Sequence, residues 1–459
     1  MSGTRQSCGC REFTRAELAR RSFAEAGRGL PAIEPGMPAP AGTGLTRRSL
    51  LVRGGALALS VYGASLLRPQ AFVEGIAKAA GSQGKVLVSV FLEGGIDGLS
   101  VLAPVDDDAY RRLRPQLRIA PGAGPAWTED PRLQWHPAAA PLHQLHGEGK
   151  VTVFPGIGYA KADQSHFTSR HYWEVGELST RTNTGWLGRL LDAVGDAENP
   201  LQGISLDGSL SPSLATARVP VAATWGASYD LWAPGVWGEV EELMFASFAR
   251  LGSAAERSRD RQVSGAGRVV RQAGTLRNQL KGFSDDGITS PVAYPDDEHF
   301  SQSLAGLAAM LAAGLPITVA SVDAPGSYDT HDEQAATLAT DLGRTCQSLL
   351  AFQRDLEARG LDGRVVTLLW SEFGRRPEEN GSAGTDHGAG GTAFLIGTPA
   401  KGKMVGEWPG LASFDEDDNL RSTADFRAVY CALLEQWFGV DAAAVIPGAS
   451  GFARPALIG

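Results

Sequence analysis

Five short runs of apolar residues limit what this chain can fold into more than any other feature of its sequence. The first covers residues 86–92, is rich in Val and Leu, and stops at Glu93-Gly94-Gly95. The other four cover residues 151–154, 317–322, 365–370 and 392–396. A continuous apolar run is typical of a strand buried on both faces of a parallel sheet, because a strand with one wet face alternates apolar and polar residues. The runs therefore predict a mostly parallel central sheet.

Stretches with helical periodicity lie between these runs. Residues 333–359 place Leu and Phe at helical spacing between the third and fourth runs, and Gly360 follows as a helix terminator. Strand–helix–strand order implies a right-handed crossover and a layered α/β fold. Residues 423–438 predict a last helix. Residues 232–286 are mainly helical, with Arg- and Gln-rich polar faces, and are expected to form an insert in a single α/β domain covering residues 80–459.

The composition is that of a globular protein and excludes some classes of partner. Of the 459 residues, 43% are hydrophobic and 20% are charged, so the chain can bury a core without disulfides. The formal net charge is −9, and the predicted domain has no dense run of Lys and Arg, which argues against a nucleic-acid partner. Cys346 and Cys431 are expected to be buried small apolar residues rather than a bridge. Cys8 and Cys10 are assigned no role.

The N-terminal region resembles an export leader of the twin-arginine type. Arg47 and Arg48 precede an uncharged, Gly- and Ala-rich run over residues 54–67, and Ala77-Lys78-Ala79 offers a small-x-small cleavage site. The run is shorter than the ~20 residues that span a bilayer, so no permanent transmembrane segment is expected. We therefore expect residues 1–79 to be a leader that is cleaved near 79/80. The translocon would be its partner, and the mature protein would be periplasmic or extracellular. The alternative is an amphipathic helix at the start of the domain.

Side chains that bind metals lie just beyond the predicted strands. The first run is followed by Asp97, the second by Ser165 and His166, the third by Asp329 and His331, and the fourth by Glu372, while Asp386 and His387 precede the fifth. In open α/β sheets ligands bind outside the carboxyl ends of the strands. Carboxylates and imidazoles gathered there would suit a divalent ion such as Zn²⁺ or Mn²⁺. The alternatives are a surface Asp-x-His loop and, for Asp97, a simple turn residue.

Several motifs together resemble a family of bacterial twin-arginine-exported proteins known as domain of unknown function 1501. The resemblance covers about residues 86–457. It rests on Phe91-Leu92-Glu93-Gly94-Gly95-Ile96-Asp97-Gly98-Leu99, Ser165-His166-Phe167, Thr184-Gly185-Trp186-Leu187-Gly188-Arg189, Tyr328-Asp329-Thr330-His331, Ser371-Glu372-Phe373-Gly374-Arg375 and Gly384-Thr385-Asp386-His387-Gly388. That family looks like a branch of the alkaline phosphatase and sulfatase superfamily. The resemblance implies an alkaline-phosphatase-like three-layer α/β sandwich with a metal site at the strand ends.

The resemblance also assigns roles to individual residues. It implies that metal ions are held by Asp97, by Asp329 with His331, and by the pair Asp386-His387. Ser165 matches the nucleophile by its order along the chain. The superfamily usually has another His ligand after the Asp-His pair, but no His follows His387 in this chain, so either His166 is the substitute or one metal site is incomplete. Glu372 is a candidate ligand or base, and either Arg170 or Arg375 is expected to stabilise the oxygens of the reacting group.

The expected function is an exported metal-dependent hydrolase that acts on phosphate or sulfate esters of small molecules. The rival expectation is a non-catalytic, metal-stabilised binding or envelope protein, and a third is a structural protein in which the cluster is a buried polar network. A catalytic ion needs a vacant coordination position, whereas a structural ion is closed by protein ligands.

Overall fold

The computed structural model describes residues 61–62, 84–226, 238–283, 288–295 and 299–459. The paired arginines, the expected cleavage site near 79/80, Cys8 and Cys10 lie outside these residues. Among the residues that are described, no helix is both long and apolar enough to cross a membrane.

A nine-stranded sheet forms the centre of the molecule, and the five apolar runs supply its longest strands. Its order is β1-β7-β6-β8-β2-β9-β12-β5-β13. The strands in this order are β1 (Val61–Tyr62), β7 (Val221–Ala223), β6 (Gly203–Ser205), β8 (Val319–Asp323), β2 (Val86–Phe91), β9 (Val365–Trp370), β12 (Gly391–Ile396), β5 (Val151–Gly158) and β13 (Ala424–Asp425).

The sheet is mostly parallel, but β12 runs against its neighbours. Strand β2 pairs in parallel with β8 and with β9, whereas β12 is antiparallel to both β9 and β5. The start of β12 therefore lies at the edge of the sheet where β2, β5, β8 and β9 end. Residues that precede β12 in the sequence thus meet residues that follow the parallel strands.

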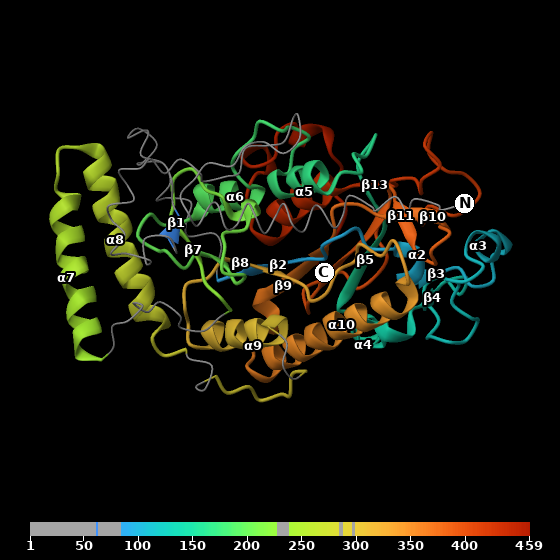
Figure 1. Cartoon of the computed structure of the whole chain (residues 1–459), viewed down its shortest axis with the longest axis horizontal. Coiled ribbons are helices and arrows are strands. Elements are labelled where there is room, and N and C mark those ends of the chain that lie inside the picture. Colours follow the sequence, from blue (N-terminus) through green and yellow to red (C-terminus); the bar gives the residue numbers. More distant parts are fainter. Residues whose placement is uncertain (1–60, 63–83, 227–237, 284–287, 296–298) are drawn as a thin grey trace, which may run out of the picture.

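Helices cover both faces of the sheet, as Figure 1 shows. One face carries α4 (Ala140–Gly147), α9 (His299–Ala312) and α10 (Gln334–Ala358), and the other carries α5 (His166–Val175), α6 (Trp186–Val194) and α11 (Phe426–Ala432). Alternate residues of β2 enter two different cores, with Val86, Val88 and Val90 on one side and Leu87 and Phe91 on the other. The predicted three-layer α/β sandwich is confirmed.

Short elements that are separate from this sheet lie at the end where the chain crosses into β12 (Figure 1). They are α2 (Gly98–Val101), β3 (Leu102–Ala103), α3 (Asp108–Leu113), β4 (Gln134–Trp135) and the antiparallel hairpin of β10 (Arg375–Glu379) and β11 (Thr385–His387). Single turns of helix are η4 (Pro137–Ala139), η5 (Pro212–Leu214), η7 (Asp362–Arg364), η9 (Ala442–Ala444) and η10 (Ala449–Gly451). The predicted last helix is α11 continued by a π-helical turn, Leu433–Trp437.

Two long helices lie at the opposite end of the molecule from the β10–β11 hairpin. They are α7 (Glu239–Glu256) and α8 (Arg261–Leu280), which run side by side within the stretch where an insert is expected (Figure 1). The carboxylate of Asp260 caps α8 by accepting hydrogen bonds from the amides of Gln262 and Val263. In this view the pair lies beside the β1–β7 edge of the sheet.

Cys346 and Cys431 are both buried and not bridged, as the sequence predicts. Burial raises the pKa of each thiol, so both remain protonated at neutral pH.

Gly94 lets two strand-end loops approach each other. Its φ is +118°, and a Cβ built on it would lie 2.2 Å from the backbone nitrogen of Asp329. Only glycine combines this backbone conformation with such close contact. The loop after β2 therefore presses directly on the loop after β8.

Replacing Gly94 with Ala should destabilise the protein by about 2–4 kcal/mol, because strain at positive φ adds to overpacking. Gly122→Ala is the matched control, since Gly122 has φ +78° but open space around a Cβ, and it should lose only about 1 kcal/mol. Urea unfolding of both variants measures the difference. Equal losses would show that the close contact at Gly94 is not a constraint.

Candidate metal centre

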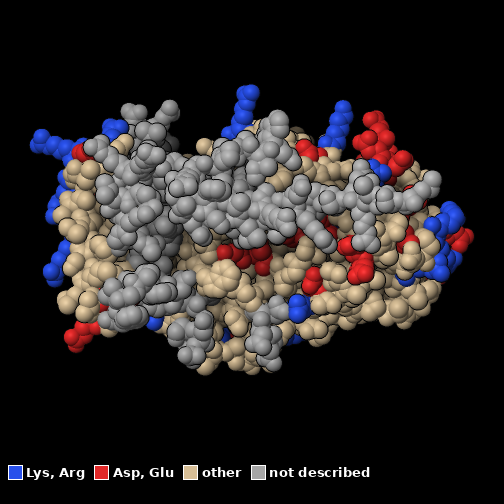
Figure 2. Space-filling view, viewed as in Figure 1, with Lys and Arg blue, Asp and Glu red and all other residues tan. Residues whose placement is uncertain are grey.

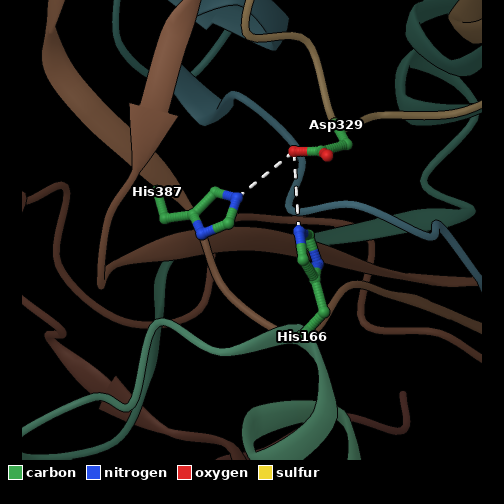
Figure 3. A group of neighbouring side chains, drawn as sticks. All are labelled: His166, Asp329 and His387. Atoms are coloured by element: carbon green, nitrogen blue, oxygen red, sulfur yellow. Dashed lines mark hydrogen bonds and ion pairs between the residues drawn. The ribbon is translucent and has the colours of Figure 1, made fainter. Parts of the chain in front are cut away.

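The start of a helix, a loop and the end of a strand bring the predicted metal ligands together at the carboxyl edge of the sheet. His166 is the first residue of α5, Asp329 and His331 lie in the loop after β8, and His387 ends β11 just before β12. The ligand atoms of His166, Asp329 and His387 all lie within 4.8 Å of one another (Figure 3). His331 stands beside this set.

The imidazoles converge on a single oxygen. Oδ1 of Asp329 is 3.2 Å from Nε2 of His387, 3.5 Å from Nε2 of His166 and 3.0 Å from Nε2 of His331. The Nε2 atoms of His331 and His387 are 2.9 Å apart. Ligands of one tetrahedral ion at bonds of ~2.0–2.1 Å stand about 3.3 Å from each other. The four observed separations, 2.9–3.5 Å, lie on either side of that value.

The other nitrogen of each ring faces a hydrogen-bond acceptor. Nδ1 of His166 is 2.7 Å from Oε1 of Glu372, and Nδ1 of His387 is 2.8 Å from the backbone oxygen of Gln164. Nδ1 of His331 is 3.2 Å from Oδ1 of Asp386. A proton held on Nδ1 by such an acceptor leaves a lone pair on Nε2, which is the arrangement found around metal-bound histidines. Three lone pairs and a carboxylate oxygen facing one another repel unless a cation lies between them.

The electrostatics of the cluster favour positive charge. Burial would raise the pKa of Asp329, but hydrogen bonds with His166, His331 and His387 and the charge of Arg375 hold it well below its usual range. Burial opposes protonation of His166, yet hydrogen bonds to Asp329 and Glu372 raise its pKa to about 9. Burial and the nearby charge of His166 lower the pKa of His387. A cation between these groups, whether a proton or a metal ion, is thus stabilised by the carboxylates.

Glu372 contacts both His166 and the turn that follows β2. Its side chain is buried and accepts hydrogen bonds from the amides of Gly94 and Gly95 and from the hydroxyl of Ser371, besides its contact with His166. Burial opposes its charge, but the hydrogen bond with His166 and its other partners keep its pKa below the ordinary value. Glu372 therefore orients His166 and the turn after β2 at once.

Arg375 is also committed to the protein. Its buried guanidinium donates to Oδ1 of Asp329 at 2.5 Å and to the backbone oxygens of Gly94, Gly95, Tyr328 and Thr385. These bonds tie together the loops after β2, β8 and β9. Arg375 therefore holds the carboxylate of Asp329 in position.

Ser165 and Arg170 flank His166 on α5. The amide of Ser165 donates to Oδ1 of Asp163, while its half-buried hydroxyl makes no hydrogen bond within the described part of the chain. Arg170 lies over the Phe91 ring and donates to Glu174 at 2.8 Å, with Glu93 and Asp323 further away. Neighbouring carboxylates raise its pKa although burial opposes this.

Asp97 is not brought into the cluster. Its side chain is fully buried and forms an ion pair with Arg114, in which Nη1 and Oδ2 are 2.6 Å apart. Asp386 stays at the edge of the site, with 57% of its side chain exposed, where it contacts His331 and accepts a hydrogen bond from Asn380.

Three contributors were missed by sequence reasoning. They are the backbone oxygen of Gln164, Arg114 and the buried side chain of Gln334. A backbone acceptor carries no sequence signal. Gln334 follows His331 by three residues and is the first residue of α10.

The solved structures that resemble this protein are only weakly similar to it. No curated protein matches the sequence. A sulfatase, PsFucS1 from Pseudoalteromonas sp., is 12% identical, with 82% of this chain and 72% of that chain covered and a TM-score of 0.35. The zinc complex of the C-terminal periplasmic domain of EcEptC from Escherichia coli is 8% identical (79% and 87% covered, TM-score 0.35). A phosphonate monoester hydrolase of Agrobacterium radiobacter is 10% identical (77% and 74% covered, TM-score 0.30).

A family model gives the more direct result. The model described as "Protein of unknown function (DUF1501)" matches residues 250–450. That stretch contains Asp329, His331, Glu372, Asp386 and His387, whereas Asp97 and His166 precede it. The resemblance to the DUF1501 family that the motifs indicate is therefore confirmed over residues 250–450.

Proposed function

We propose that this protein is an exported metal-dependent hydrolase of phosphate or sulfate esters. One observation carries the proposal: Nε2 atoms of His166 and His387 converge on the carboxylate of Asp329 at ligand-like separations, while each ring is held through Nδ1. Two imidazoles and a carboxylate are a donor set that suits Zn²⁺ or Mn²⁺. These three residues would hold the ion.

His331 is the residue that we assign to proton transfer. Its Nδ1 faces the exposed carboxylate of Asp386, and its Nε2 lies beside both Asp329 and His387. Such an Asp–His pair orients the imidazole and stabilises its protonated form. His331 would carry the proton that passes from the nucleophile to the departing ester oxygen.

The bound ion would supply Lewis-acid stabilisation of the charge that develops on the reacting group. We propose the hydroxyl of Ser165 as the nucleophile, since it lies next to His166 and makes no hydrogen bond in the described part of the chain. Its oxygen would bond to phosphorus or sulfur as the ester bond breaks. Water would then attack the same atom, the Ser165 oxygen would leave and take back a proton, and phosphate or sulfate would be released. Glu372 and Arg375 act as positioning residues, because their polar atoms already bind the protein.

The alternative is a metal-stabilised protein without turnover. It is favoured by the position of His331, whose Nε2 is close enough to Asp329 and His387 to be a fourth ligand. Four protein ligands would close the coordination sphere, as in structural zinc sites.

The leader motif supports export through the twin-arginine translocon.

The substrate is proposed to be a small ester. Figure 2 supports this choice over nucleic acid: among the described residues on the visible face, acidic and basic side chains both occur near the middle and at the rim, and no broad basic stripe crosses the face.

His387→Asn and Asp329→Asn should each abolish stoichiometric metal binding, because each removes a ligand from a three-ligand site. Elemental analysis by mass spectrometry on the full chain, purified without chelator, measures this. His143→Asn is the control, since His143 lies on α4 and packs near Trp135, and it should retain the ion. A wild-type protein without metal, or variants that keep it, would refute the proposal.

His331→Asn should keep the ion and lower the rate of ester hydrolysis by about 10²–10⁴-fold, the usual contribution of a general acid or base. Metal content and turnover of an aryl phosphate and an aryl sulfate are measured on the same preparation. If this variant loses the ion as His387→Asn does, His331 is a metal ligand. That result would support the non-catalytic alternative.

Changing both Arg47 and Arg48 to Lys should leave the protein in the cytoplasm, because the paired arginines are the address that the translocon reads. Fractionation of cells that express either form measures the location. Export that continues unchanged would exclude the twin-arginine route.

A further inference from the structure

The carboxylate of Asp97 accepts four hydrogen bonds from side chains of the protein. Oδ2 accepts from Nη1 of Arg114 at 2.6 Å, from the hydroxyl of Ser100 at 2.6 Å and from the amide of Gln334. Oδ1 accepts from Nη2 of Arg114 at 3.1 Å. Both side chains of the ion pair are at most 1% exposed. A carboxylate offers about four lone-pair positions, and four donor contacts already surround this one, three of them at Oδ2, so a metal ion would have to compete with these donors.

Arg114 is held firmly in this position. Its Nε donates to the backbone oxygen of Pro377 at 2.6 Å, and Nη2 donates to that of Arg376 at 2.8 Å. The guanidinium therefore joins the end of α3 to β10 and meets Asp97 with two parallel bonds. Two-pronged pairing of this kind is specific to arginine.

Gln334 connects this ion pair to the loops of the metal centre. Its amide nitrogen donates to Asp97, and its oxygen accepts from the hydroxyls of Thr330 and Thr385 at 2.9 Å and 2.6 Å. Thr330 lies between Asp329 and His331, and Thr385 lies two residues before His387. The Asp97–Arg114 pair is thus linked through Gln334 to residues that neighbour the ligands in the sequence.

The resemblance to alkaline phosphatases and sulfatases implies an ion at Asp97, and the residues present do not fit one. We propose that this protein binds a single metal ion, at His166, Asp329 and His387, and that the Arg114 guanidinium supplies at Asp97 the positive charge that a second ion would supply. This inference rests on the proposed function, because it takes the first ion as bound. The fixed guanidinium also couples α3 and β10 to the loops that carry the ligands.

The test is the number of ions per chain. The full chain is saturated with Zn²⁺ and, separately, with Mn²⁺, and native mass spectrometry counts the bound ions. One ion is expected in each case. Two ions per chain would overturn the inference, and none would overturn the proposed function instead, so the two failures are distinguishable.

A double variant, Asp97→Asn with Arg114→Met, tests the position directly. Removing both charges avoids leaving one buried and unpaired, which would cost several kcal/mol, so the variant should fold. It should still bind one Zn²⁺ per chain, because the change removes no ligand of the proposed site. Loss of the ion from the folded variant would show that Asp97 takes part in binding it, and would refute the inference.

The matched control is Asp108→Asn with Arg111→Met, an exposed ion pair on the same helix. This control should change neither the number of Zn²⁺ ions bound per chain nor the Kd for Zn²⁺. Circular dichroism establishes that each variant is folded. If the first double variant does not fold, the stoichiometry of the wild type still decides between one ion and two.

Discussion

The negative charge of Asp329 is the constraint on which the rest of this structure depends. Its Oδ1 lies within 3.5 Å of three imidazole nitrogens and receives a hydrogen bond from Arg375. A half-buried carboxylate at the meeting point of four chain segments is stable only if every neighbour is oriented toward it. Glu372 and Arg375, which both follow β9, and the backbone oxygen of Gln164, which follows β5, provide that orientation.

The site has a rigid side and an accessible side. Glu372, Arg375 and the Asp97–Arg114 pair are buried, and their polar atoms bind the protein. His331 and Asp386 lie on the exposed side, with 20% and 57% of their side chains accessible. Groups that must hold a geometry are therefore separated from groups that could exchange protons with a substrate. This division fits a catalytic ion better than a closed structural one, because a closed ion needs no exposed acid and base beside it.

Much of the fold was predictable because its signal is local. Each apolar run became a strand, since an uninterrupted apolar segment has to be covered on both faces. Most site residues were identifiable because strand-end loops of a parallel sheet share one edge. The residues that this rule identified and the structure brings together are His166, Asp329, His331, Glu372, Asp386 and His387. Asp97 satisfied the same positional rule, yet its carboxylate turned toward Arg114, a residue with no distinguishing pattern around it.

The sequence by itself determined the layered α/β class, the positions of the long strands and the side chains able to bind a metal, because these follow from periodicity and residue chemistry. Only the tertiary structure decided that β12 runs antiparallel, which carries His387 to the edge where β8 ends. It alone decided which carboxylate meets imidazoles and which meets a guanidinium. The reason is that such pairings join residues distant in sequence, and their energy depends on burial and distance, neither of which a linear pattern contains.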